Sequence, residues 1–148
     1  MKRWLSMRWL SLVCRLVVGG VFIWASLDKL AHPAEFAKAI HHYRIAPYAL
    51  LHPAALLLPM VEAVAGVALV IGWQRRGAAL ACAGMLLVFL VAIGSALVRG
   101  LDISCGCFNT DGGHAVGLDL FWRDLLLLIA CLPPLLAARG GFGLDRDR

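Results

Sequence analysis

Charged residues are scarce in this sequence of 148 residues and make up 16% of it, whereas hydrophobic residues make up 61%. A soluble domain averages about 25% charged and about 45–50% apolar residues. These proportions exclude a small soluble core and indicate an integral membrane protein. The net charge is +5, but the basic residues are scattered at the ends of apolar segments and form no basic patch or stripe. Nucleic-acid binding is therefore excluded.

Internal repeats of about 20–50 residues are absent, and so are low-complexity tracts, which leaves one domain over residues 1–148. Four apolar segments are long enough to cross a membrane, which takes about 20 residues. The predicted spans cover about residues 10–30, 53–73, 77–98 and 118–138. Gln74-Arg75-Arg76 predicts a tight turn and an antiparallel helix pair. The basic start is typical of a signal peptide, but no small-x-small cleavage site precedes Asp28-Lys29, so we expect the first span to be retained.

The distribution of Lys and Arg predicts how these spans are oriented, because cytoplasmic flanks carry the excess. One side carries nine of these residues, including Arg75 and Arg76, and the other side carries five. Both termini are therefore predicted to be cytoplasmic in a bacterial inner membrane. The loop of residues 31–52 and the loop between the third and fourth spans are predicted to be periplasmic.

The first outer loop predicts a short amphipathic helix at the membrane interface. His32-Pro33-Ala34-Glu35 is typical of a helix start, with proline at the first helical position and an acid in the first turn. Apolar residues from Phe36 to Tyr43 recur at helical spacing, and Pro47 is expected to end the helix. The helix could cover the mouth of the bundle, or it could simply seal the fold.

Every histidine falls on this outer side: His32, His41, His42, His52 and His114. With Cys105 and Cys107 they could form a copper or zinc site, because imidazole and thiolate suit these ions. No familiar zinc spacing is present, however. His41 and His42 would also diverge by about 100° on a helix. Interfacial or solvated histidines are the preferred interpretation, and no metal is assigned.

Cys105-Gly106-Cys107 lies in the outer loop between the third and fourth spans. One intervening residue is too short for relaxed disulfide geometry, so a bridge would be strained and easily reduced. On the periplasmic side disulfides can form and persist. The pair therefore predicts thiol–disulfide exchange with a partner protein, and a structural or unpaired role is the alternative.

The attacking thiol is left open, because cations that would favour a thiolate and acids that would oppose it both lie nearby. These residues are Arg99, His114, Arg123, Asp102 and Asp111. The other cysteines are predicted to be buried small hydrophobes in the cytoplasmic halves of their spans. They are Cys14, Cys82 and Cys131.

Glu62 lies about nine residues into the second predicted span, near the middle of the bilayer. An acid at this depth must be protonated, hydrogen-bonded or paired, and is a functional candidate by default. Lys29 is the best predicted partner and Arg123 the second. The functional interpretation is a group that handles protons or orients a ligand such as a quinone. The structural alternative is an ion pair that fixes helix register.

Three segments resemble a known family. Residues 22–30 and 59–66 resemble the first two helices of DoxX-like membrane proteins, and Ser104-Cys105-Gly106-Cys107-Phe108 resembles the methylamine utilisation protein MauE branch. The resemblance implies a four-helix membrane protein that helps to form or rearrange the disulfides of methylamine dehydrogenase during its maturation. It also implies that Cys105 and Cys107 are the redox pair and that Lys29 and Glu62 are the polar pair between helices.

The sequence thus predicts an all-α, four-span inner-membrane protein with a short amphipathic outer helix. Its expected function is periplasmic thiol–disulfide chemistry on a partner protein, with Lys29, Glu62 and Arg123 as candidate cofactor residues and quinone as the candidate cofactor. DsbB-type enzymes also combine four helices, quinone and cysteines, but this chain lacks a second outward pair. The alternatives are a non-enzymatic membrane subunit of a quinone-linked oxidoreductase and a small metal-binding or carrier membrane protein.

Overall fold

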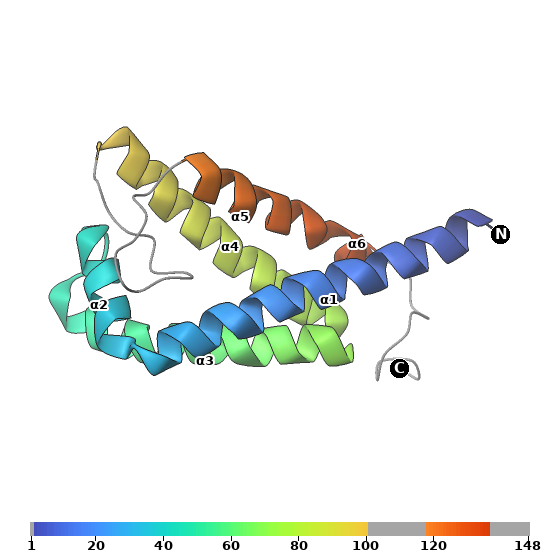
Figure 1. The fold of residues 1–148 in the computed structure, drawn as a ribbon, viewed down its shortest axis with the longest axis horizontal. Helices are drawn as coiled ribbons and strands as arrows, with labels where there is room; N and C mark the ends of the chain where they lie inside the picture. Colours follow the sequence, from blue (N-terminus) through green and yellow to red (C-terminus); the bar gives the residue numbers. More distant parts are fainter. Residues whose placement is uncertain (1, 101–117, 137–148) are drawn as a thin grey trace.

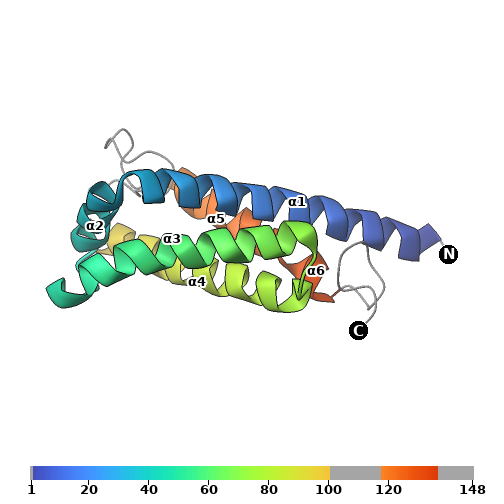
Figure 2. The same cartoon turned by 90° about the horizontal axis from the view of Figure 1, so that it is seen from below.

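The computed structural model describes residues 2–100 and 118–136, and these fold into helices without any strand. Six helices follow one another along the chain (Figure 1). They are α1 (Lys2–Ala31), α2 (Pro33–His42), α3 (Tyr48–Ile71), α4 (Arg75–Val98), α5 (Leu118–Ala130) and α6 (Leu132–Leu136). In both views α1 and α3 run side by side, α4 and α5 form a second pair, and α2 lies across one end (Figures 1 and 2).

Three of these helices are long and apolar enough to cross a membrane: Arg8–Ala31 of α1, Tyr48–Ile71 of α3 and Arg75–Val98 of α4. Each has 24 residues, which is about 36 Å of helix against about 30 Å of hydrocarbon. Large apolar side chains cover their outer surfaces, for example Trp24, Val64 and Val91, which are 69%, 65% and 70% exposed. Such a surface requires lipid rather than water around it.

The first three predicted spans are confirmed as helices, although all three begin earlier than expected, α4 by only two residues. α1 already begins at Lys2, and α3 begins at Tyr48 rather than at Pro53. Pro47 provides the extended residue before α3, and Pro53 lies inside the helix. Pro53 is the sixth residue of α3, so its ring nitrogen leaves the carbonyl of Ala49 without a helical donor, which is one hydrogen bond near the helix start.

The fourth apolar segment is helical but interrupted. α5 ends at Ala130, and after Cys131 the short helix α6 continues to Leu136. Pro133 and Pro134 explain the break, because neither ring nitrogen can donate to the preceding turn. α5 has 13 residues, or about 20 Å of helix, so α5 alone does not cover the span predicted over 118–138, whose last two residues lie outside the described ones. The segment packs on α4 (Figure 1), and its crossing of the membrane stays a prediction.

The turn between α3 and α4 covers residues 72–74, two residues before the predicted turn at 74–76. Gly72 and Gln74 carry the left-handed backbone, with φ of 80° and 43°, whereas Arg75 and Arg76 already belong to α4. Glycine adopts this conformation without steric cost, which places the end of α3 at Ile71. The predicted antiparallel pairing of α3 with α4 is confirmed (Figure 2).

Two facing glycines bring α1 and α3 close together. A Cβ atom at Gly19 would lie 2.8 Å from the carbonyl oxygen of Gly66, and one at Gly66 would lie 3.0 Å from that of Gly19. Small residues at a membrane helix interface permit this approach of the two backbones. Their contact fixes α1 against α3 along the part of the bundle that carries Glu62.

The predicted amphipathic helix is confirmed as α2. Its Phe36 and Ala39 are buried against the bundle, whereas Lys38 and His41 are exposed. The helix ends at His42 and not at Pro47, because Arg44 adopts a left-handed φ of 52°. Pro47 instead precedes α3.

Candidate functional site

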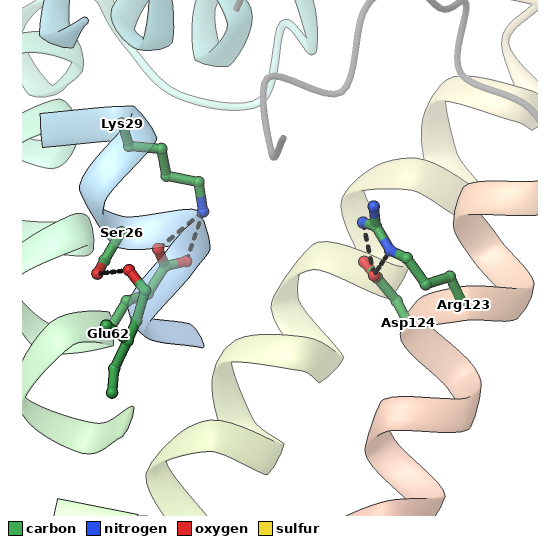
Figure 3. A network of polar contacts seen from close by, with 6 residues as sticks. Ser26, Lys29, Glu62, Arg123 and Asp124 are labelled. Atoms are coloured by element: carbon green, nitrogen blue, oxygen red, sulfur yellow. Dashed lines mark hydrogen bonds and ion pairs between the residues drawn. The ribbon is translucent and has the colours of Figure 1, made fainter. Parts of the chain in front are cut away.

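Lys29 and Glu62 form a buried ion pair between α1 and α3. The Lys29 Nζ lies 2.7 Å from Oε1 and 2.8 Å from Oε2 of Glu62, so the ammonium donates to both carboxylate oxygens (Figure 3). Lys29 is 1% and Glu62 2% exposed. The pairing predicted from the intramembrane position of Glu62 is confirmed. Breaking it would leave a charge buried without its counter-ion.

Two aromatic rings complete the surroundings of the Lys29 ammonium. Its Nζ lies 5.1 Å from the ring centroid of Phe36 in α2 and 4.7 Å from that of Phe89 in α4. These distances fall within the range of cation–π attraction, which strengthens when the cation is desolvated. One ammonium therefore draws together α1, α2, α3 and α4. Neither contact was predicted from the sequence. Phe36 belongs to the apolar stripe of the outer helix, and no motif around Phe89 distinguishes it from other apolar residues of its span.

A second ion pair lies on α5. Asp124 is 2% exposed, and its Oδ1 accepts hydrogen bonds from Nε and Nη2 of Arg123 at 3.0 and 2.8 Å. Figure 3 shows this pair across from Lys29 and Glu62. The sequence predicted Arg123 as the second candidate partner of Glu62, whereas in the structure Arg123 pairs with Asp124.

The two ion pairs face one small cavity of about 30 Å³, lined by all four of these side chains and by apolar residues of the helices around it. A cavity needs about 10–15 Å³ to hold a water molecule, whereas one of about 150 Å³ holds a benzene ring. The cavity therefore has room for water and none for a quinone ring in this conformation. The four charges compensate one another around the cavity.

The cysteine pair lies outside the described residues. Cys105, Cys107, Asp102, Asp111 and His114 all fall in the segment 101–117. The two elements that flank this segment are described, namely the end of α4 and the start of α5. The segment is thus attached to the same end of the bundle as α2 (Figure 1).

Arg99 fastens the end of α4 to the end of α2. Its Nη2 donates to the backbone carbonyl of Tyr43 at 2.6 Å and to Oγ of Ser95 at 3.2 Å, and its Nε donates to the Ser95 carbonyl at 3.1 Å. Sequence reasoning had considered Arg99 as a cation beside the cysteines. The described bonds fix Arg99 itself, which lies two residues before the segment 101–117.

The remaining cysteines occupy the apolar core. Cys82 and Cys131 are fully buried in the cluster that contains Val18 and Leu69, and Cys14 is half-buried. None of the three forms a disulfide. For Cys82 and Cys131 the prediction of small buried hydrophobes is confirmed. Within residues 2–100 and 118–136, no three His, Cys, Asp or Glu side chains are grouped so that they could hold a metal ion.

The family model for "Methylamine utilisation protein MauE" matches residues 7–137. The chain belongs to the MauE family. It is 36% identical over 119 residues to the methylamine utilization protein MauE of Paracoccus denitrificans, covering 80% of this chain and 64% of the relative. It is 32% identical over 126 residues to MauE of Methylorubrum extorquens, covering 81% of this chain and 68% of the relative.

A third relative is MauE of Methylophilus methylotrophus, 33% identical over 98 residues, which are 66% of this chain and 52% of the relative. The chain thus spans between about half and two thirds of the length of these curated relatives. No solved structure matches it significantly. Family membership and the apolar helices together identify a membrane protein.

Proposed function

We propose that this protein supports the maturation of a periplasmic partner protein in methylamine utilisation, through thiol–disulfide chemistry at Cys105 and Cys107. The observation that carries the proposal is the MauE match over residues 7–137, which includes both the apolar helices and the cysteine pair. Methylamine dehydrogenase is the partner that the family resemblance implies. More distantly, we infer kinship with DoxX-like proteins from residues 22–30 and 59–66.

The proposed topology has four spans, with α5 and α6 forming the last one and both termini in the cytoplasm of a bacterial cell. The excess of Lys and Arg on the side of Arg75 and Arg76 supports this orientation. The cysteine segment is then periplasmic, together with α2. The buried pair of Lys29 and Glu62 lies beneath the same end of the bundle.

The exchange begins when the thiolate of one cysteine attacks a disulfide of the partner. A mixed disulfide forms, and one partner sulfur leaves as a thiolate. In isomerisation a different partner thiolate then attacks the mixed disulfide and releases the original cysteine, with no net transfer of electrons. In disulfide formation the Cys105–Cys107 bridge instead takes two electrons from a partner dithiol, and a membrane quinone is the class of acceptor that could restore it.

Lys29, Glu62, Phe36 and Phe89 hold the helices beneath this segment in the proposed mechanism. Their contacts tie α1, α2, α3 and α4 together. Arg99 links the end of α4 to the carbonyl of Tyr43, after α2, two residues before the segment. The cysteine segment therefore joins a part of the bundle that these contacts hold together.

Mixed-disulfide trapping tests the proposal. Cys107→Ser and Cys105→Ser are expressed separately with the partner, and adducts are sought on non-reducing gels followed by mass spectrometry. One variant is expected to accumulate a covalent adduct, because its attacking thiol can no longer be released by the other. Cys14→Ser is the matched control, since Cys14 is also a free thiol but lies in α1; it should give no adduct.

If neither variant yields an adduct and both still support production of active methylamine dehydrogenase, the thiol–disulfide mechanism is refuted. The non-enzymatic subunit then becomes the favoured function. An adduct that reduction releases and that contains a periplasmic protein supports the proposal and identifies the partner.

A further inference from the structure

A second pocket, of about 550 Å³, lies between α2 and the first turns of α3. Two faces of α2 have separate roles here. Phe36 points to the Lys29 ammonium, whereas Ala34, Ala37 and Lys38 line the pocket. The volume falls in the range of small-molecule sites, about 300–1,000 Å³. The pocket is therefore distinct from the small cavity at the ion pairs.

Basic and titratable nitrogens line the rim of the pocket. They belong to Lys38, His41, His42 and His52, which are all exposed. The rings of His41 and Tyr48 lie 6.5 Å apart, and those of His41 and His42 lie 6.3 Å apart, so these side chains form one group. Among the described residues that line the pocket there is no acid, but Nζ of Lys38 lies 3.3 Å from Oε1 of Glu35, one turn earlier on α2. Both side chains are exposed, at 68% and 44%, so the lysine can turn from Glu35 to a ligand in the pocket. The rim thus suits an anion.

The floor of the pocket is apolar. Leu51 and Ala55 are 3% and 2% exposed, and Leu56 and Ala34 extend the same surface. An apolar floor beneath a cationic rim matches a molecule with an anionic head and a hydrocarbon tail. Anionic phospholipids of this kind surround a bacterial membrane protein, and lysine or arginine near the membrane surface attracts their head groups.

We propose that this pocket holds one anionic phospholipid. Its phosphate lies among Lys38 and the histidines of the rim, and the first segment of an acyl chain lies along Leu51, Ala55 and Leu56. A neutral quinone could use the floor but would gain nothing from the charge of Lys38, so the rim favours the lipid. The lipid would brace α2, and with it Phe36, against the membrane interface.

Native mass spectrometry of the full-length protein in detergent tests this directly. The protein is titrated with phosphatidylglycerol and with phosphatidylcholine of the same acyl chains. We expect phosphatidylglycerol to bind more tightly, and Lys38→Ala to weaken it about fivefold, the effect of one basic residue near an anionic lipid. Combining Lys38→Ala with His41→Ala, His42→Ala and His52→Ala should abolish the preference. His32→Ala is the control, because His32 is exposed nearby but does not line the pocket.

A blocking variant separates occupancy of the pocket from general charge. Ala34→Trp fills the pocket from an exposed position on α2, whereas Ala49→Trp adds the same ring at an exposed position of α3 outside it. Only Ala34→Trp should lose bound phosphatidylglycerol, with circular dichroism showing that both variants remain helical. The proposal would be overturned if both lipids bound equally, or if the four-site variant or Ala34→Trp still bound phosphatidylglycerol preferentially. It would also be overturned if decylubiquinone displaced the lipid and bound Lys38→Ala with unchanged affinity.

Discussion

The two ends of this bundle bury cations in different ways. Where α3 turns into α4, Arg15 is 2% exposed and donates to the backbone carbonyls of Leu69 at 2.9 Å and Val70 at 3.2 Å. At the end covered by α2, Lys29 donates instead to the carboxylate of Glu62, between the rings of two phenylalanines.

A backbone carbonyl is neutral and has a fixed dipole, whereas a carboxylate is charged and can take up a proton. Arg15 therefore acts as a cap on α3, because it satisfies carbonyls that the end of a helix leaves without an intrahelical donor. The pair of Lys29 and Glu62 faces a cavity and a second ion pair. The first end thus contains a cation held by backbone, whereas the second contains two ion pairs around a cavity.

Breaking the Lys29–Glu62 pair is expected to have the largest effect. Lys29→Met leaves a buried carboxylate without its counter-ion, which typically costs about 3–5 kcal/mol. The free energy of unfolding is measured in detergent micelles by denaturant titration with circular dichroism. The double variant Lys29→Met/Glu62→Leu removes both charges and should recover most of the loss. A double variant as unstable as the single one would show that the pair is not coupled as the structure indicates.

The glycine contact between α1 and α3 lies between the two ends. Gly19→Ala is expected to destabilise the protein by about 3 kcal/mol, because the new Cβ would press on the backbone of Gly66 and overpacking costs roughly this much. Gly20→Ala is the control in the same helix, where the Cβ meets nothing within 4 Å. In the same unfolding titration Gly20→Ala should be neutral or stabilising. Equal losses from both variants would contradict the close approach of the helices.

Removal of the Arg15 cap should cost less than loss of the buried ion pair. Arg15→Met leaves two carbonyls of α3 without their donor, and hydrogen bonds to a charged group contribute about 2 kcal/mol. The same titration measures it, together with maturation of the partner protein in cells. The comparison of the two ends predicts lower stability with an unchanged pattern of trapped mixed disulfides, because Arg15 is remote from the cysteine segment. A changed trapping pattern would remove the functional distinction between the ends.

The aromatic contact should have the smallest effect. Phe89→Leu keeps an apolar side chain but removes one ring from the Lys29 ammonium, for an expected loss of about 1 kcal/mol. Trp24→Leu is the control, because Trp24 is 69% exposed on the outer surface of α1. If the loss at Phe89 persists in the Lys29→Met background, it comes from packing and not from the cation.

The sequence predicted part of this arrangement because depth in the membrane is strongly constraining. An acid at position 62 required a partner, and Lys29 was the cation within reach at the end of the first span. The rings of Phe36 and Phe89 could not be predicted, since their contact depends on how α2 and α4 pack in three dimensions. Pro133-Pro134 is a local signal for the helix break at Cys131. The fourth span was predicted from its hydropathy alone, and hydropathy does not register the effect of proline on helix hydrogen bonds.

The burial of Asp124 had no such local signal. Its neighbours Arg123 and Asp119 gave it the pattern of a polar helix start, whereas the structure places it in the core beside Arg123. The shared pocket of His41 and His42 was also missed. Adjacent residues diverge on an isolated helix, but the start of α3 passes close enough for both to line one cavity.

Accessibility labelling of Cys105 and Cys107 tests the central claim most directly. Cys14, Cys82 and Cys131 are replaced by serine or alanine, the protein is mildly reduced, and a membrane-impermeant maleimide is added to intact spheroplasts or to inside-out vesicles. The account predicts labelling of the loop in spheroplasts and protection in sealed inside-out vesicles. Labelling only in the inside-out vesicles would place both thiols in the reducing cytoplasm and contradict it.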